Sequence, residues 1–210
     1  MAQTSAAPTT GPSTPATPST PEAPSTAAAP QTSASPAATT AGDLDQSVFA
    51  ARLGRWKAVP GEGDEGTYQP NGSWVHALDP TQAVQGLSMQ ACRPGTTLPQ
   101  PRHVLASDYR DDSQRRAVGQ ALRFANAEQA QAFAKAYRQL LQGCVGQQDP
   151  MSVTLIQQGN PLVDRRTMAA NQTRWVEVVR TDGALVKLVA ADEGEEPLTP
   201  AEVSALAAAV

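Results

Sequence analysis

The stretch Val118–Cys144, VGQALRFANAEQAQAFAKAYRQLLQGC, combines a strand pattern with a helix pattern. In its first seven residues, larger side chains alternate with small or polar ones, which predicts a strand. One face of this strand would carry Val118, Gln120, Leu122 and Phe124. Asn126 has Gln129 three residues later, which is the spacing of a helix N-cap. The apolar residues that follow recur at helical intervals: Ala130, Phe133, Ala134, Tyr137 and Leu141. We therefore predict a strand that leads into an amphipathic helix ending at Gly143.

Shorter patterns on both sides of this unit predict further elements. Asp43 or Asp45 is a candidate cap for a first helix, and weaker alternation predicts several strands. The predicted helix is Ser47–Leu53, and the predicted strands are Ser73–Leu78, Leu87–Ala91 and Ser152–Ile156.

A hairpin is predicted where Asp182-Gly183 separates two valine-rich runs, Arg174–Arg180 and Ala184–Ala190. In that register Val179 faces Val186 and Val176 faces Val189. One apolar face is expected to cover a helix and contains Trp175, Val179, Val186 and Leu188. Thr199, Pro200 and Glu202 then have the pattern of a capped helix start, which predicts a short alanine-rich helix to Val210. The fold class expected is α+β, a mostly antiparallel sheet with helices packed on one face.

Residues 1–42 have a different composition from the rest of the chain. They are almost entirely Ala, Pro, Ser, Thr and Gly, with no aromatic residue. Such a segment cannot bury enough apolar surface to offset its chain entropy of about 1–2 kcal/mol per residue. We predict a disordered tether over 1–42, stiffened by its prolines, and a single sensor-like domain over 43–210.

Charge and hydropathy bear on the partners and the location of the protein. The formal net charge of −4 argues against nucleic-acid binding, which needs a basic face. The sequence contains no run of about 18 apolar residues, so it predicts no membrane-spanning helix. A tether of this composition is typical of stalks outside the membrane. We expect an extracytoplasmic protein, secreted or attached to the cell envelope, with the export signal missing from this chain. A cytosolic protein with a low-complexity tail is the alternative.

No motif in the sequence predicts catalysis. The run Gly61–Gly66 spells GxGxxG, but no helix pattern follows and three acidic residues would repel a pyrophosphate, so we interpret it as a solvated loop. His76 and His103 lie in no zinc-binding or hydrolase motif. The acidic runs near Asp111 and Glu193 lack calcium-loop spacing and are interpreted as solvated surface. We expect no catalytic residue, no metal and no cofactor.

The chain contains two cysteines, Cys92 and Cys144. An even number without a CxxC motif is compatible with one structural disulfide. Two separate buried thiols would fit the same spacing, because free cysteines behave as small apolar residues. Export would favour the disulfide.

The unit from Val118 to Cys144 resembles the extracellular sensor domain of PknH-type Ser/Thr kinases and related actinobacterial envelope lipoproteins. In that family a strand of the type VxQAVxF leads into a helix with AxxA and a following Phe, here Val118–Phe124, Ala127–Ala130 and Phe133. The valine-rich stretch Trp175–Asp192 and the short final helix also resemble the family. The family's second disulfide has no counterpart here, since the chain has no third cysteine.

The resemblance implies that Cys144 pairs with Cys92 and that the domain binds an unidentified ligand, a small molecule or an envelope component, in a surface cleft. We predict Trp74, His76 and Tyr109 as residues that line this cleft, although the simpler interpretation of Trp74 is that it belongs to the core. The function expected is that of a non-catalytic extracytoplasmic sensor or ligand-binding domain. A structural or protein-interaction protein of the envelope is the first alternative, and a hydrolase that uses a histidine is the second.

Overall fold

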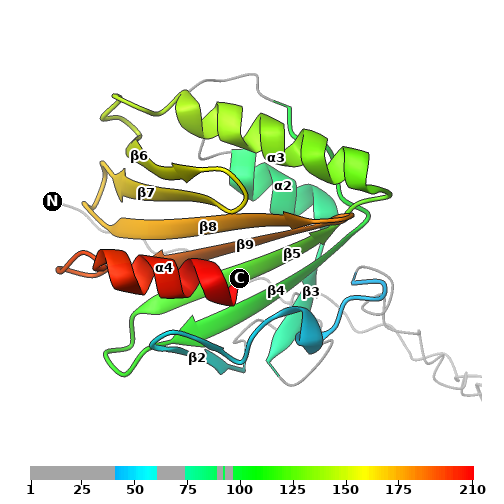
Figure 1. Cartoon of the computed structure of the whole chain (residues 1–210), viewed down its shortest axis with the longest axis horizontal. Coiled ribbons are helices and arrows are strands. Elements are labelled where there is room, and N and C mark those ends of the chain that lie inside the picture. Colours follow the sequence, from blue (N-terminus) through cyan, green and yellow to red (C-terminus); the bar gives the residue numbers. More distant parts are fainter. Residues whose placement is uncertain (1–40, 61–73, 89–91, 93–96) are drawn as a thin grey trace, which may run out of the picture. The chain divides into compact units, whose positions relative to one another are not determined.

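The computed structural model describes residues 41–60, 74–88, 92 and 97–210 (Figure 1). Within these ranges the helices are the short 3₁₀ helix η1 (Gln46–Val48), α2 (Pro80–Ser88), α3 (Ala127–Gln142) and α4 (Pro200–Ala209). The strands are β1 (Arg52–Leu53), β2 (Trp56–Val59), β3 (Val75–Leu78), β4 (His103–Arg110), β5 (Arg116–Arg123), β6 (Met151–Gln158), β7 (Leu162–Met168), β8 (Arg174–Asp182) and β9 (Leu185–Asp192).

All of these strands belong to one sheet, whose order is β1-β2-β4-β5-β9-β8-β7-β6. Strands β2 and β3 both pair with β4, at different positions along the same strand. Every strand pair is antiparallel. Most neighbours follow each other along the chain, but β5 pairs with β9, so that Ala117 lies opposite Ala191. This β5–β9 junction joins the first block of strands, β1–β5, to the second block, β6–β9.

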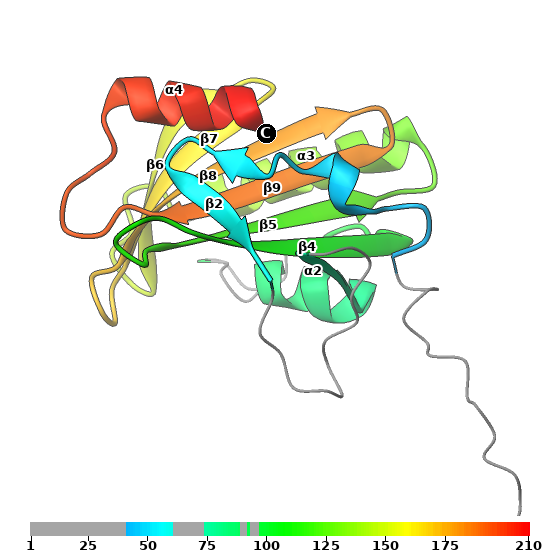
Figure 2. The same ribbon diagram turned by 90° about the horizontal axis from the view of Figure 1, so that it is seen from below.

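The two faces of the sheet carry separate hydrophobic cores. Alternate residues of the strands, such as Leu122, Val179 and Leu188, lie in the core beneath α2 and α3. The residues between them, such as Val178 and Val189, lie in the core beneath α4. Figure 2 shows α4 on the opposite side of the sheet from α2. The expected α+β class with an antiparallel sheet is confirmed; α2 and α3 share one face, whereas α4 covers the other face.

The strand–helix unit that dominates the sequence forms as predicted. The side-chain Oδ1 of Asn126 accepts a hydrogen bond of 2.9 Å from the backbone N–H of Gln129. The buried residues of α3 are Ala130, Phe133, Tyr137, Leu140 and Leu141. The aromatic rings of Phe124 and Phe133 are 5.2 Å apart, so the end of β5 packs against the helix that follows it.

The hairpin of β8 and β9 forms, but its register differs from the predicted one. Val179 lies opposite Leu188, and Val176 lies opposite Ala191. The two turn residues are Gly183 and Ala184, and Gly183 has a φ of +53°. A glycine at the first of two turn positions is the pattern of a type II′ turn, which places the turn one residue later than Asp182-Gly183. The register therefore shifts by two residues, which keeps each side chain on its predicted face.

Two predicted elements are wrong in type. The helix predicted at Ser47–Leu53 is the 3₁₀ helix η1 followed by strand β1. Leu87, the first residue of a predicted strand, belongs to α2. The sequence Asp79-Pro80 ends β3 as predicted, but it also begins α2, because the Oδ1 of Asp79 accepts hydrogen bonds from the backbone N–H groups of Thr81 and Gln82. Strands β2, β4 and β7 and helix α2 were not predicted.

Most of the predicted tether, residues 1–40, and the loop Gly61–Gly66 lie outside the described residues. The last two tether residues, Ala41 and Gly42, are described, and the side chain of Ala41 is fully buried. Gly42 has a φ of +59° and lies against the ring of His103, where a Cβ atom would approach the ring to 2.5 Å. The folded part thus includes these two residues. No helix in the described part of the chain is long and apolar enough to span a membrane.

Candidate functional site: a pocket over a buried ion cluster

A pocket of about 310 Å³ opens on the sheet face that α2 and α3 share. Its floor spans the β5–β9 junction and continues onto β8 and β7, and α2 provides one wall. Its lining residues are Leu87, Val118, Gln120, Arg166, Met168, Trp175, Glu177, Leu188 and Ala190. The size lies at the lower end of the range of small-molecule sites, and the walls are mostly apolar, as is usual for such sites.

The hollow exists because small or short side chains occupy the centre of the floor. Ala190 of β9 lies between Val118 of β5 and Glu177 of β8, each directly opposite it in the sheet. An alanine between two strands leaves room above the sheet that a larger residue would fill. Leu87, Trp175 and Met168 lie around this room and supply its apolar walls.

The polar part of the lining belongs to a buried cluster of charged groups. Asp164, Arg166 and Glu177 are 0%, 4% and 4% exposed. Arg166 donates through Nε to Asp164 at 2.7 Å and through Nη2 to Tyr137 at 2.9 Å, and Nη2 also donates to Glu177. The hydroxyl of Tyr137 in turn donates to Glu177 Oε2 at 2.9 Å. We call these residues the ion cluster.

The strand register creates this cluster. Asp164 of β7 lies directly opposite Glu177 of β8, which brings two carboxylates together on the face under α3. Arg166, two residues after Asp164, projects from the same face and lies between the two acids. Tyr137 reaches the cluster from α3, and the guanidinium of Arg166 lies 5.7 Å from the centre of its ring. Burial of a charge is costly unless it is paired, so all members depend on each other.

Burial determines the protonation of Glu177. Removal from water raises the pKa of Glu177 from 4.5 to about 7, the neighbouring Arg166 acts against this rise, and the Asp164 charge adds to it. Burial also raises the pKa of Tyr137 well above its ordinary value, which keeps its hydroxyl protonated and able to donate. A buried carboxyl with a strongly shifted pKa in a pocket is a feature of functional sites as well as of structural ion pairs.

Gln120 is the other polar residue of the lining. Its Oε1 atom is buried and has no hydrogen-bond partner among the described residues. A buried acceptor without a partner costs about 1–3 kcal/mol. The lining of the pocket therefore includes a residue of β5 with an unused buried acceptor and a carboxylate of β8.

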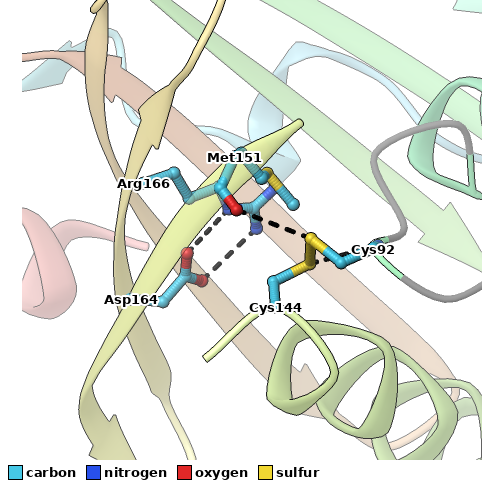
Figure 3. The surroundings of a disulfide bond; sticks show 5 residues. All are labelled: Cys92, Cys144, Met151, Asp164 and Arg166. Atoms are coloured by element: carbon cyan, nitrogen blue, oxygen red, sulfur yellow. Dashed lines mark hydrogen bonds and ion pairs between the residues drawn. A yellow bond between two sulfur atoms is a disulfide. The ribbon is translucent and has the colours of Figure 1, made fainter. Parts of the chain in front are cut away.

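The disulfide between Cys92 and Cys144 lies beside this site. It is formed as the resemblance implied, with a Cα–Cα distance of 5.0 Å. Figure 3 shows Arg166, Asp164 and Met151 in its surroundings. The Sγ of Cys92 is 3.6 Å from the carbonyl oxygen of Met151, which is a close contact and not a hydrogen bond, because a disulfide sulfur carries no proton. Cys92 follows α2 closely, so the bond attaches the wall that contains Leu87 to the end of α3.

The residues predicted to line a cleft do not line this pocket. Trp74 and Tyr109 do come together, with their rings 6.0 Å apart, but they lie in the cores on the α4 side of the sheet. Tyr109 is fully buried, and its hydroxyl donates to the carbonyl oxygen of Ala50 at 3.0 Å. His76 is half-buried on β3, opposite Ala106, on the other face of the sheet from Tyr109. The three residues therefore do not form one site.

His76 lies at the edge of the sheet face that α2 covers. Desolvation lowers the pKa of His76, the charge of Asp108 acts in the opposite direction, and Arg116 adds to the lowering. Neither His76 nor His103 is among the residues that line the pocket. No group of three His, Cys, Asp or Glu side chains that could hold a metal ion occurs in residues 41–60, 74–88, 92 and 97–210.

The interpretation of the acidic runs as solvated surface is wrong for two of their members. Glu193 is fully buried and accepts from Arg165 Nε at 2.9 Å and from the backbone N–H of Leu198 at 2.8 Å. Asp111 is 4% exposed and accepts from Arg115 Nε at 2.7 Å. Both carboxylates hold turns in place at the ends of strands, which explains why the chain tolerates their burial.

The sequence did not predict that the residues of the ion cluster and Gln120 form part of a site. One signal was present: Glu177 lies between Trp175 and Val179, two residues assigned to an apolar face, so its side chain had to lie on that face as well. The partners could not be found in the same way, because β7 has no apolar alternation.

Comparison with known proteins gives a partial likeness in fold. No protein-family model matches the sequence, and no curated protein matches it significantly. Among solved structures, the fold is similar to the crystal structure of the extracellular domain of PknH from Mycobacterium tuberculosis, with a TM-score of 0.41 and 12% sequence identity. The likeness covers 55% of this chain and 63% of that chain. Membership of that family stays a prediction.

Proposed function

We propose that the domain is a non-catalytic, extracytoplasmic sensor or ligand-binding domain of the cell envelope, and that the pocket over the ion cluster is its binding site. One observation carries the proposal: an apolar hollow of about 310 Å³ whose polar lining consists of buried Glu177 and Arg166 and the acceptor of Gln120. Apolar walls with a few convergent polar groups are the usual composition of small-molecule sites.

The disulfide supports the location outside the cytoplasm. Structural disulfides persist in oxidising compartments and are rare in the cytosol, where thiols are kept reduced. The composition of residues 1–42 is that of an extended spacer, which agrees with a domain held away from a membrane or wall. Attachment as a lipoprotein and an actinobacterial source rest on the sequence resemblance alone.

The pocket favours binding over the two alternatives. A protein-interaction surface would be expected to be broad and apolar, whereas this site is concave and has buried polar groups. A histidine-dependent hydrolase would place His76 or His103 in the pocket, and neither is among its lining residues. The ion cluster lacks an obvious nucleophile, since its members are a tyrosine, an arginine and two carboxylates that bind each other.

A neutral probe tests the pocket as a binding site. We expect 4-phenyl-1-butanol to shift the methyl NMR signals of Leu188, Ala190 and Leu87 in the full chain. Ala190→Phe should abolish the shifts, because the added ring occupies the hollow above the floor. Ala132→Phe adds the same ring on the exposed side of α3 and should leave them unchanged.

Two kinds of result would overturn the proposal. Binding that is the same in wild type and in Ala190→Phe would show that the pocket is not the site. Shifts that map to the α4 face, or no shifts with any of the probes described below, would remove the proposal.

A further inference from the structure

We infer that the pocket selects a small molecule with an apolar body and a positively charged, hydrogen-bond-donating head, such as a primary ammonium group. The inference rests on the proposed function, since it names the ligand class of the same pocket. It is carried by the sign of the charges around the pocket and by the kind of hydrogen-bonding atom that the pocket presents.

The ion cluster has an excess of negative charge. Asp164 and Glu177 are both carboxylates. Among the described residues, the groups that face them are Arg166 of β7 and Tyr137 of α3. Two acids and one guanidinium leave one negative charge when both acids are ionised. A buried charge without compensation is costly, so a bound cation would stabilise the ionised cluster.

The polar atoms of the pocket are mainly acceptors. Gln120 lines the pocket, and its buried Oε1 has no partner among the described residues; Glu177, also in the lining, carries a carboxylate. The Nε and Nη2 groups of Arg166 donate to other members of the cluster, namely Asp164, Tyr137 and Glu177. A head group that donates hydrogen bonds satisfies these acceptors, whereas a carboxylate or phosphate head would face them with further acceptors.

The remaining lining defines the body of the ligand. Leu87, Met168 and Trp175 surround a floor of Val118, Leu188 and Ala190. These groups can cover a short alkyl or aryl body but offer it no hydrogen bond. Trp175 could also stabilise a cation that lies over its ring. The two features together describe an amphiphilic amine, not a sugar or a nucleotide.

Three probes with the same body and different heads test the inference. They are 4-phenylbutylamine, 4-phenyl-1-butanol and 4-phenylbutanoate, and their affinities for the full chain are measured by calorimetry at pH 8. We expect the amine to bind at least about tenfold more tightly than the alcohol, since hydrogen bonds to charged groups contribute more than neutral ones, and the carboxylate to bind most weakly.

Two variants locate the preference. Glu177→Gln removes the excess charge with little change of shape, and it should reduce the preference for the amine to within about threefold. Gln120→Leu leaves the ion cluster intact and should weaken the amine more than the alcohol, so it remains informative if Glu177→Gln fails to fold. Ala190→Phe should abolish binding of all three probes.

The results separate the two proposals. If the alcohol or the carboxylate binds in the pocket as tightly as the amine, the ligand class is wrong and the binding site stands. A preference for the amine that persists in both Glu177→Gln and Gln120→Leu overturns the inference that these two residues select the ammonium head. If no probe binds, or if Ala190→Phe changes nothing, both proposals fall.

Discussion

Glu177 is a carboxyl group that the fold places in an apolar strand face and then surrounds with hydrogen-bond donors. Its neighbours on that face, Trp175 and Val179, are typical of a sheet core. Tyr137 and Arg166 are the donors that allow its burial. The side chain thus depends on contacts from two other elements, and its protonation state affects the stability of the whole domain.

The pH dependence of stability follows from this group. Its pKa in the folded protein, about 7, lies above the ordinary value of 4.5, so the folded state holds the proton more tightly. The stabilisation is complete below the ordinary value and is lost as the pH rises to about 7. We expect the unfolding free energy of wild type minus that of Glu177→Gln to fall by about 3 kcal/mol across this window. Urea unfolding at several pH values measures it, and a difference that stays flat would contradict the assignment.

Arg166 should matter far more than a surface arginine. Arg166→Leu leaves Asp164 and Glu177 buried without their cation, which we expect to cost about 3–5 kcal/mol. Arg116→Leu is the matched control, because Arg116 pairs with Asp108 at 2.7 Å but its side chain is 52% exposed, and its loss should cost less than about 1 kcal/mol. Chemical denaturation compares the two, and similar losses would show that the buried pair is not special.

The individual site residues were the least predictable part of the molecule from its sequence. The prediction of Trp74 and Tyr109 rests on their aromatic and polar character, and the two rings do meet, but as core residues. The members of the ion cluster come from β7, β8 and α3, and only the register of β7 on β8 brings Asp164 opposite Glu177. Local sequence carries no information on such a pairing.

At the scale of single elements, the disulfide links α2 to α3 through cysteines that come shortly after the end of each helix. Cys92 and Cys144 are 52 residues apart in the sequence. In the chain-entropy account, a loop of this length stabilises the folded state by about 4 kcal/mol. We expect the double variant Cys92→Ala/Cys144→Ala to lose this amount in thermal or urea unfolding.

The single variants provide the control for that prediction. If the stabilisation comes from the bond, Cys92→Ala alone should lose about as much as the double variant, because either change breaks the bond. Losses that simply add would indicate that each side chain contributes through its own packing instead.

Helix α4 offers a test of its start signal. The hydroxyl of Thr199 accepts from the backbone N–H of Glu202 at 3.3 Å, and the Glu202 carboxylate accepts from the backbone N–H of Thr199 at 2.9 Å. Thr199→Ala removes the first bond and should cost about 1 kcal/mol. Ser204→Ala, on the exposed side of the same helix, should be neutral or slightly stabilising in the same melting experiment.

Elements with a strong local signal were predictable, and elements formed by distant partners were not. The caps of α3 and α4 could be found from four or five consecutive residues. Strand β7, LVDRRTM, shows no alternation, because its buried charges Asp164 and Arg166 pair with each other, and Arg166 also pairs with Glu177 of β8. The turn of the β8–β9 hairpin was misplaced by one residue, since Asp182-Gly183 and Gly183-Ala184 are both acceptable turn sequences.

At the scale of the whole described fold, the class could be predicted but the strand order could not. The count of strands, the hairpin signal and the helix caps are sufficient for an α+β sheet. The pairing of β5 with β9 connects Ala117 to Ala191, and nothing in either strand specifies the other. The placement of α4 on the opposite face from α2 and α3 follows from this order, and so does the position of the pocket.

The β5–β9 junction has a consequence for how the protein would respond to an occupant. Val118 and Gln120 approach the pocket from the first block of strands, whereas Leu188 and Ala190 approach it from the second. A molecule held between them would act as a clasp that resists separation of the two blocks. Amide hydrogen exchange should therefore slow most along β5 and β9 when 4-phenylbutylamine is added, while the edge strand β6 changes little. If exchange slowed equally over the whole sheet, the two blocks of strands would not separate at the β5–β9 junction.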